Sequence, residues 1–255
     1  MAREKYTFAQ RQCISAAGKL SHTTGMLGPG VRVGVAVSGG VDSFVLLEVM
    51  RIRQRIVPFH FSFMALHVNP GFEPESHAPM TAWLEEKGIA GHLEVTDHGP
   101  RAHSPENRNP SACFYCAMLR RKRLFELCRV YKLTHLAFGH TADDLMANFF
   151  MNLCQNGRVD GMSMREPFFK GLLTVIRPLM LLEKKQIAKA ARDWKLPVWA
   201  NACPSSGVTR RTGIMDNVER LTDGHKGMHN TIRAALCRWQ MSLTVPDSEG
   251  TPKKL

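Results

Sequence analysis

Six consecutive residues in the first fifth of the chain have the composition of an anion-binding loop. They read Ser38-Gly39-Gly40-Val41-Asp42-Ser43 and lie between a buried apolar stretch, residues 31–37, and an apolar helical segment, residues 41–50. Adjacent glycines let the backbone turn tightly and bring its N–H groups against an anion, and two hydroxyls and the positive end of the helix dipole add to the attraction. Neither the Walker pattern nor the G-x-G-x-x-G dinucleotide pattern is present. The loop therefore predicts a phosphate site of another kind, with a glycine-rich turn that binds nothing as the alternative.

Three of the seven cysteines occupy positions where thiols bind metals or react. Cys113 and Cys116 form a C-x-x-C pair at the expected start of a helix, where the helix dipole and Arg120 lower the pKa of a thiol. This spacing fits a redox pair, half of a zinc site or part of an iron–sulfur site, with two unrelated buried thiols as the alternative. Cys203 adds a third thiol in a polar turn, and turns carry sites more often than cores do. Of the other four, Cys128 and Cys154 are expected to pack inside helices, and Cys13 and Cys237 are unassigned.

A pair of carboxylates and a run of cations form the third group. Asp143 and Asp144 follow Gly139 at the end of a predicted strand, where parallel sheets bind ligands, although paired acids also cap helices. Four successive cations, Arg120–Arg123, cannot share one face of a helix. Arg120 or Arg121 should therefore face the site, and the others solvent or a polyanion.

The elements that must hold these groups alternate between strands and helices. Strands are predicted over residues 31–37, 61–68, 92–96 and 135–140, and helices over 41–50, 81–87, 114–131, 142–154 and 183–194. This alternation is typical of an α/β fold in which helices flank a parallel sheet. The other segments are predicted as a long loop over 97–112, a hairpin over 168–181, a short strand over 197–200 and mostly helix over 213–239.

Composition and charge narrow the class of protein. Apolar residues make up 44% of the 255 residues and charged ones 22%, which excludes a disordered chain. Residues 1–110 carry 11 basic and 10 acidic side chains, a net of +1, whereas residues 111–255 carry 23 and 12, a net of +11. A concentrated excess favours a face that binds nucleic acid, with a merely basic surface as the alternative. No apolar run reaches the roughly 18 residues of a membrane span, which predicts a cytoplasmic protein whose thiols serve metal binding or catalysis.

Five motifs in order resemble those of a known family. The loop SGGVDS is followed by CFYCAMLRRKRLF, AFGHTADDLMANFFMNL, VIRPLMLLEKKQI and the turn at Cys203. In this order they resemble the tRNA 2-thiocytidine synthetases, iron–sulfur-dependent members of the PP-loop ATP pyrophosphatase superfamily. The resemblance implies a PP-loop α/β fold with four parts: an N-terminal helical segment over 1–30, the ATP pyrophosphatase domain over 31–200, a helical extension with the third cysteine over 201–240, and a flexible tail over 241–255.

The same resemblance implies an activity and its partners. A family member uses ATP and Mg²⁺ to adenylate C2 of a cytidine in the anticodon loop of tRNA, and sulfur delivered from a [4Fe–4S] cluster then replaces the oxygen. The cluster ligands fall on Cys113, Cys116 and Cys203, with zinc on these thiols as the alternative. A cysteine desulfurase or free sulfide is the implied sulfur donor, and a homodimer is one expected assembly. The other implied positions are Ala36, Ser38, Gly39, Gly40, Asp42, Ser43, His67 and Gly139 for the nucleotide, with Asp42 also on Mg²⁺; Asp143 and Arg120 for catalysis; and Arg121, Arg123, Arg210 and Arg211 for RNA.

Two departures from the family pattern keep other functions open. The family commonly has a second C-x-x-C, and here its first position is Ala200. The family also carries Glu in D-D-x-x-E-T, where this chain has Ala147 followed by Asn148. One alternative is therefore a related PP-loop enzyme that thiolates or amidates another RNA base or a small molecule. The other is a non-catalytic iron–sulfur protein that binds RNA or acts as a sensor.

Overall fold

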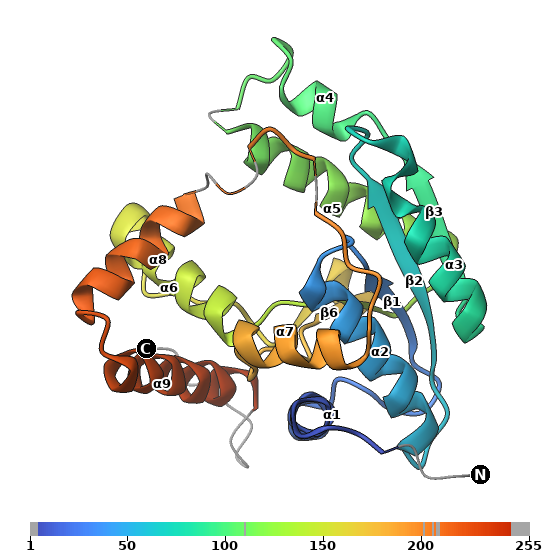
Figure 1. Ribbon diagram of the computed structural model, residues 1–255, viewed down its shortest axis with the longest axis horizontal. Coiled ribbons are helices and arrows are strands. Elements are labelled where there is room, and N and C mark those ends of the chain that lie inside the picture. The colour runs from blue at the N-terminus through green and yellow to red at the C-terminus, as the bar shows by residue number, and fades with distance from the viewer. Residues whose placement is uncertain (1–4, 110, 201, 206, 208–209, 246–255) are drawn as a thin grey trace.

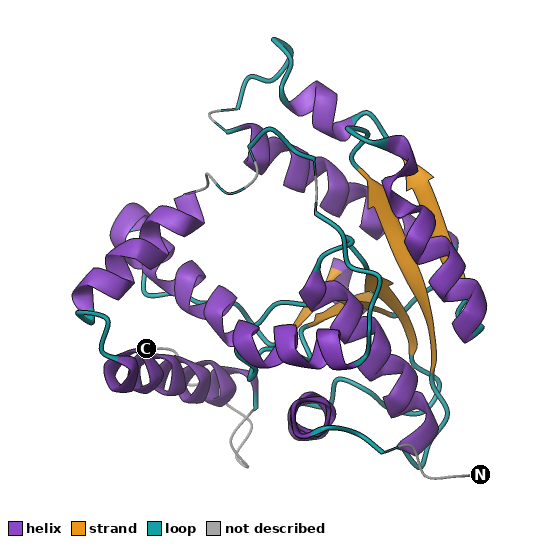
Figure 2. Ribbon diagram, in the orientation of Figure 1, coloured by secondary structure: helices purple, strands orange, loops and turns teal. Residues whose placement is uncertain are grey.

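A six-stranded sheet with strand order β3-β2-β1-β4-β6-β5 forms the centre of the computed structural model, which describes residues 5–109, 111–200, 202–205, 207 and 210–245 (Figures 1 and 2). The strands are β1 (Arg32–Ala36), β2 (Ser62–Asn69), β3 (Gly91–Val95), β4 (His135–Ala137), β5 (Arg165–Phe168) and β6 (Leu173–Ile176). Strands β3, β2, β1, β4 and β6 pair in parallel, and β5 runs antiparallel to β6 at the edge. The α/β class with a parallel sheet is therefore confirmed, and the antiparallel edge strand is an addition to it.

Helices cover both faces of this sheet. They are α1 (Phe8–Thr23), α2 (Val41–Ile56), α3 (Ala78–Lys87), α4 (His98–Ala102), α5 (Ala112–Val130), α6 (Ala142–Asn156), α7 (Lys184–Asp193), α8 (Arg210–Leu221) and α9 (Lys226–Thr244), with the 3-10 turns η1 (Pro74–His77) and η2 (Phe169–Gly171). Helices α1, α2 and α7 pack against one another, whereas α5 packs on β2 and β4. Two predictions were wrong in detail: the segment 97–112 contains α4, and residues 197–200 form no strand.

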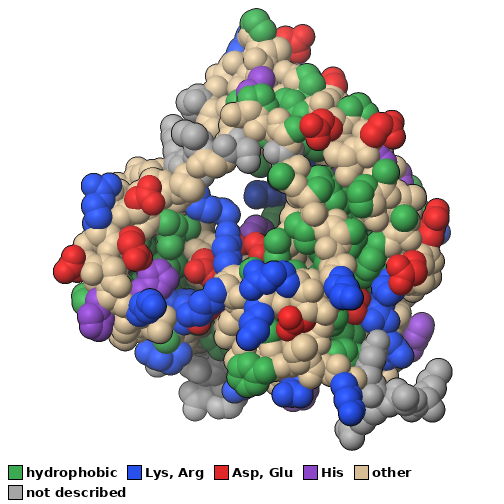
Figure 3. Space-filling model, in the orientation of Figure 1, with side chains coloured by type: hydrophobic (Ala, Val, Ile, Leu, Met, Phe, Trp, Pro, Cys, Tyr) green, Lys and Arg blue, Asp and Glu red, His purple; other side chains and the backbone are tan. Residues whose placement is uncertain are grey.

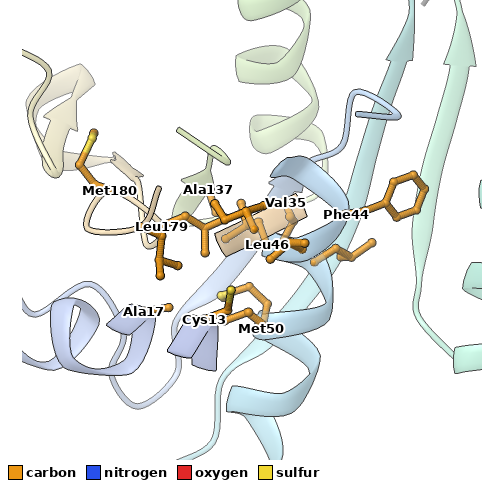
Figure 4. Close-up of a cluster of buried hydrophobic side chains, with 14 of the residues drawn as sticks. Cys13, Ala17, Val35, Phe44, Leu46, Met50, Ala137, Leu179 and Met180 are labelled. Carbon is orange, nitrogen blue, oxygen red and sulfur yellow. The ribbon is translucent and has the colours of Figure 1, made fainter. Parts of the chain in front are cut away.

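The main core lies between β1 and the layer of α1, α2 and α7 (Figure 4). Val35 pairs with Ala65 of β2 on one side and Ala137 of β4 on the other, so β1 is central and its valines are fully buried. Such a strand has no solvent face, which explains why its sequence is a continuous apolar run. Cys13 of α1 lies in this core, where burial raises the pKa of its thiol to about 12. This thiol is a packing residue.

Local capping fixes where two site helices begin. The Ser111 side chain accepts a hydrogen bond from the Phe114 N–H and starts α5 at the C-x-x-C pair. Thr141 and Asp144 form a reciprocal capping box that starts α6 immediately after β4. Both helices therefore begin at the carboxyl-terminal edge of the sheet, where ligands bind in open α/β folds.

The C-terminal helices α8 and α9 pack on α6 instead of on the sheet. In Figure 1 they lie with α6 on one side of the molecule, opposite β2, β3 and α3. Helix α9 continues to Thr244, into the segment 241–255 that was predicted to be a tail, and residues 246–255 lie outside the described residues. Among the helices of the described residues, none is long and apolar enough to cross a membrane.

Candidate active site

The SGGVDS segment forms a tight loop between β1 and α2. Gly39 has a positive φ of 91°, and a Cβ atom placed on it would lie 2.4 Å from the indole ring of Trp199. The Ser43 hydroxyl accepts a hydrogen bond from the Ser38 N–H at 3.1 Å and donates to the Gly40 carbonyl at 2.8 Å. These bonds close the loop on itself at the N-terminus of α2. The loop thus presents a helix N-terminus with the curvature that an anion requires.

A cleft of about 250 Å³ opens beside this loop at the carboxyl-terminal edge of the sheet. Its basic side chains are Arg120, Lys184 and Arg211, and its acidic ones are Asp42 and Asp144. Figure 3 shows an opening in the molecule, with Lys and Arg side chains along its left and lower edges. The remaining lining comes from the loop and the strands: Ala36, Val37, Ser38, Ser43, Leu66, Val68, Leu124, Phe138, Gly139 and His140. A pocket with apolar walls and three cations fits a nucleotide that carries several phosphates.

Gly139 lets the end of β4 approach the loop closely. A Cβ atom at this position would lie 2.8 Å from the Asp42 carbonyl oxygen and 3.1 Å from the Ser43 nitrogen. Any side chain here would push the two segments apart. His140, which follows, has a buried Nδ1 for which no partner is found among the described residues. Burial lowers the pKa of His140, helped by the Arg177 charge and opposed by Asp144, so the imidazole is neutral near pH 7.

The two carboxylates that open α6 face different sites. Asp144 lies in the cleft, where its Oδ1 is 2.9 Å from Arg211 Nη1 and 3.4 Å from Lys184 Nζ. Asp143 accepts a hydrogen bond from the Lys184 backbone N–H at 2.8 Å and lines a second, separate pocket. Burial alone would raise the pKa of Asp144, but the Lys184 and Arg211 charges and the Thr141 N–H hold it below its usual value. The structure therefore places Asp144 in the cleft and Asp143, which we expected there, at the start of α7.

The Asp42 carboxylate lies near two other carboxylates, those of Asp143 and Asp144. Its pKa is raised to about 6, chiefly because of burial and also because of the Asp144 and Asp143 charges, with Lys184 opposing them. A carboxylate that ionises at this cost gains from a nearby cation, which is the usual situation of a residue that helps bind a divalent metal. Its position in the cleft is compatible with the predicted Mg²⁺ role.

His67 supports the loop from the opposite side of the sheet. Its Nδ1 hydrogen-bonds the Val37 carbonyl at 2.8 Å, and its ring lies 5.9 Å from the Trp199 ring. Leu66 and Val68, its neighbours in β2, line the cleft, but His67 does not. Burial lowers its pKa to about 4, so the ring is neutral at pH 7. The imidazole thus fixes the backbone of the loop and does not face the predicted nucleotide.

The three candidate thiols lie close enough to influence one another. Burial raises the pKa of Cys116, the Arg120 charge opposes this, and the Cys203 and Cys113 thiols raise it further. All three are free and half-buried. Ser205, two residues beyond Cys203, holds the turn against the end of α4, because its hydroxyl is 2.9 Å from His103 Nε2. Among the described residues, no three Cys, His, Asp or Glu side chains converge in the geometry of a metal site.

Of the two thiols predicted to pack inside helices, one does so. Cys128 is buried, and burial raises its pKa to about 12. Cys154 is exposed on α6, so the prediction for this residue was wrong. An amphipathic pattern identifies which positions share a helix face, but it does not show whether that face is covered, and in the last turn of α6 both Leu153 and Cys154 are exposed.

The four basic side chains of α5, residues 120–123, have three different surroundings. Arg120 lines the cleft. Arg121 and Lys122 are exposed. Arg123 pairs with Glu94 through two contacts of 2.7 and 2.8 Å and with Glu126 at 3.1 Å, so a contact with RNA would require these ion pairs to open. The expectation that the run cannot share one face is therefore met by the geometry.

Two arginines, Arg210 and Arg211, begin helix α8. Arg211, which we expected on RNA, reaches into the cleft and pairs with Asp144. The side chain of Arg210 lies outside the described residues. Arg211 is therefore positioned to contact a ligand at the phosphate loop.

The comparisons with known proteins agree with this geometry. Residues 19–203 match the model of the PP-loop domain family. The tRNA-cytidine(32) 2-sulfurtransferase of Geobacter sulfurreducens is 33% identical over 193 residues, which cover 76% of this chain and 75% of that protein. The chain belongs to the tRNA sulfurtransferase family of PP-loop proteins. The enzyme of the same name from Syntrophotalea carbinolica is 32% identical over 211 residues, covering 83% of this chain and 81% of its own.

The fold of this PP-loop protein also occurs among solved structures. The U34-tRNA thiolase of Methanococcus maripaludis, solved with its [4Fe-4S] cluster, superposes with a TM-score of 0.72 at 22% identity, covering 94% of this chain and 85% of that one. The NH3-dependent NAD synthetase of Campylobacter jejuni superposes with a TM-score of 0.51 at 13% identity, covering 98% and 99%. At these identities the similarity is one of fold.

The sequence of this sulfurtransferase family member did not identify every residue of the cleft. Lys184 and His140 received no role, and Asp144 was placed second to Asp143. The pattern Thr141-x-x-Asp144 was a usable signal, because a capping box points its third residue back toward the helix start. Lys184 gave no local signal, since it meets Asp144 across 40 residues of chain. Ala147, the departure from the family pattern, is fully buried on α6.

Proposed function

We propose that this protein is an ATP-dependent tRNA 2-sulfurtransferase that forms 2-thiocytidine in the anticodon loop, at the cytidine 32 named for its relatives. The observation that carries the proposal is the single cleft in which Arg120, from the helix of the C-x-x-C pair, faces the phosphate loop together with Lys184 and Arg211. The arrangement offers a place for a triphosphate and a place for sulfur chemistry on neighbouring elements.

The first step is adenylation of the base. The loop and the N-terminus of α2 bind the β and γ phosphates of ATP, and Lys184 and Arg211 offset the charge that develops as pyrophosphate leaves. The C2 oxygen of the cytidine attacks the α phosphorus, which turns a poor leaving group into AMP. Asp42 is the candidate ligand for a Mg²⁺ ion on the phosphates, because its ionised form is disfavoured until a cation lies beside it.

Asp144 acts through its two basic partners. It is buried, and its Oδ1 contacts both Lys184 of α7 and Arg211 of α8, two helices that follow α6 in the chain. Holding two flexible side chains in one geometry before the reaction removes their reorganisation cost from the barrier. Asp144 is therefore a positioning residue.

The thiols of Cys113, Cys116 and Cys203 are the candidate ligands of a [4Fe–4S] cluster. The donor chemistry fits, because iron–sulfur clusters are held by thiolates, these three thiols are free, and Cys113 and Cys203 each lie near enough to Cys116 to raise its pKa. Three protein ligands leave one iron of such a cluster open to an external sulfur atom. Three thiolates also suit a zinc ion, and analysis of the bound metal distinguishes zinc from an iron–sulfur cluster. Arg120 lines the cleft, and its charge partly offsets the burial that raises the pKa of the Cys116 thiol.

In the second step, a sulfur nucleophile attacks the activated C2 and AMP departs. The sulfur comes from a cysteine desulfurase or from free sulfide. The basic part of the chain beyond residue 110 contacts the tRNA. An RNA loop suits this reaction, since its unpaired bases can enter a pocket.

The test is the modified nucleoside itself. tRNA from a bacterial strain that lacks 2-thiocytidine is incubated with protein that has been reconstituted anaerobically, ATP, Mg²⁺ and sulfide, and its nucleosides are analysed by mass spectrometry. The proposal expects 2-thiocytidine together with AMP, and none when ATP is omitted. The absence of 2-thiocytidine with intact metal and bound ATP would refute the substrate assignment.

The same assay separates the two alternatives. A thionucleoside other than 2-thiocytidine, or AMP formed only with a small-molecule acceptor, would identify a related PP-loop enzyme. This alternative is considered because buried Ala147 stands where the family carries Glu. Binding of tRNA with no AMP formed would identify a non-catalytic RNA-binding protein.

A further inference from the structure

One face of α5 carries exposed apolar side chains in an unusual place, beside the C-x-x-C pair. Phe114 lies between Cys113 and Cys116 and is 60% exposed, and Met118, one turn further along, is 44% exposed. Helix positions four residues apart share a face. Large apolar groups that stay in water near a reaction centre need a reason, because an exposed apolar patch usually marks a binding surface.

The same face continues as a stripe of cations and aromatics. Positions 114, 118, 121, 125 and 129 are spaced by four, three, four and four residues, so they lie along one side of the helix. Arg121 and Arg129 are exposed there, and Lys122 is exposed beside them. Over 15 residues at 1.5 Å each, the stripe runs for about 22 Å away from the cysteines.

At its far end the stripe meets the β5–β6 hairpin. The Phe125 ring lies 5.4 Å from Phe168 and 5.5 Å from Phe169, measured between ring centres. Phe169 is 57% exposed, and it and Lys170 both have positive φ angles, of 52° and 57°. For residues with a Cβ, this backbone conformation is unfavourable. The backbone of the hairpin is therefore strained at these two residues, and the aromatic side chain of Phe169 is exposed to solvent next to Lys170.

The charges on this face favour one kind of occupant. Among the described residues, neither Arg121 nor Lys122 has an ion pair, whereas Arg123 on the opposite side of the helix is paired with two glutamates. The nearest acid of the hairpin strand, Glu166, is paired with Arg177. Unpaired cations that alternate with exposed aromatic and thioether side chains match unstacked nucleotides, whose phosphates need cations and whose bases stack on apolar planes.

We infer that this stripe, Phe114, Met118, Arg121, Lys122, Phe125, Arg129 and Phe169, is a track for the single-stranded RNA next to the target base. The inference rests on the proposed function and extends it, because it assigns the RNA contact to stacking side chains in addition to arginines. Phe114 stacks on a base that neighbours the target, since it lies between two candidate cluster ligands, Cys113 and Cys116. The stripe binds RNA loops in preference to duplexes, whose bases are already stacked.

The experiment compares matched variants in fluorescence anisotropy with a fluorescein-labelled RNA hairpin that has a pyrimidine-rich loop, and with a blunt RNA duplex of the same length. Phe114→Ala should weaken hairpin binding about 5- to 100-fold, the range for losing one base–aromatic stack, and leave duplex binding unchanged. Phe114→Trp should restore hairpin affinity. Phe8→Ala is the matched control, because Phe8 is 65% exposed on α1, on another helix.

Two further measurements keep the outcome clear. Iron content and visible absorbance after anaerobic reconstitution show whether Phe114→Ala disturbs the thiols on either side; if it does, Met118→Ser carries the test, with an expected loss of hairpin affinity and normal iron. Lys122→Glu should weaken hairpin and duplex alike and reduce the salt dependence of binding.

The possible results separate this inference from the proposed function. If the unaltered protein binds ATP but not the hairpin, the proposed function fails. If it binds the hairpin, but Phe114→Ala and Met118→Ser behave like Phe8→Ala, the stripe is not an RNA track. Loss of self-association or of binding to a sulfur-donor protein in these variants, with hairpin binding intact, would assign the face to a protein partner and overturn the inference.

Discussion

The substitution Gly39→Ala tests the geometry of the phosphate loop most directly. Gly39 has a φ of 91°, and a Cβ on it would lie 2.4 Å from two carbon atoms of the Trp199 ring. The left-handed conformation costs an alanine about 1 to 2 kcal/mol. Pushing a packed ring aside costs about 1 to 3 kcal/mol more. The free energy of unfolding should therefore fall by about 2 to 5 kcal/mol, before any effect on ATP.

The adjacent glycine supplies the control. Gly40 has a φ of −79°, which any residue adopts, and a Cβ there would meet only the Ser38 hydroxyl, at 3.5 Å. We expect Gly40→Ala to change the unfolding free energy by less than about 1 kcal/mol, because the loss of glycine freedom in the unfolded chain and the weaker helix cap nearly cancel. The assay is urea unfolding without nucleotide, with the midpoint and slope fitted separately.

A double-mutant cycle isolates the steric part. In the background of Trp199→Ala, the ring is gone and Gly39→Ala should cost only the conformational penalty of about 1 to 2 kcal/mol. The coupling energy between the two positions should then be about 1 to 3 kcal/mol. Equal destabilisation by Gly39→Ala and Gly40→Ala, or a coupling below about 0.5 kcal/mol, would refute the reasoning.

Three other expectations follow from the site. Asp144→Asn should reduce AMP formation from ATP and tRNA about 10- to 100-fold, because Lys184 and Arg211 lose the group that positions them, whereas Asp143→Asn should stay within about threefold; the opposite order would show that Asp143 is the site residue. Cys203→Ala should lose most of the iron and sulfide found after reconstitution and Cys154→Ala, exposed on α6, should retain it; an intact cluster in Cys203→Ala excludes the three-thiolate site. His67 has a pKa of about 4 when folded, below its unfolded value of about 6.5, so the stability it contributes is complete above pH 6.5 and is lost as the pH falls toward 4. Between pH 7 and 4.5 the unaltered protein should lose about 2 to 3 kcal/mol more stability than His67→Asn, and parallel curves from urea unfolding would contradict this.

The parts of the fold that the sequence predicts well are those decided by neighbours in the chain. The loop between β1 and α2 is recognisable because a buried strand, two glycines and an apolar helix follow one another directly. The C-x-x-C pair is placed correctly at the start of α5 for the same reason, since Ser111 caps that helix from the adjacent position. Local patterns carry this information because backbone conformation and helix phase depend on a few residues.

The parts that the sequence predicts poorly depend on which side chain meets which across long stretches of chain. Arg123 was assigned to RNA, but it pairs with Glu94, 29 residues earlier. Asp143 and Asp144 differ by one step on the helix, which is a rotation of about 100°, and this decides which of them enters the cleft. Neither outcome follows from charge or motif alone. Each requires the sheet order, which brings β3 beside α5 and α7 beside α6.

The segment after α7 joins the phosphate loop to the third thiol, and its length limits how far apart the two reactions can occur. The Trp199 N–H donates to the Gly39 carbonyl at 3.2 Å, and Cys203 lies four residues later. A fully extended chain spans at most about 3.6 Å per residue, so the Cα atoms of Trp199 and Cys203 lie within about 14 Å of each other. At its other end the turn is held to α4 by the contact between His103 and Ser205. The contact of Trp199 with Gly39 and the four residues to Cys203 therefore limit how far the third thiol can lie from the phosphate loop.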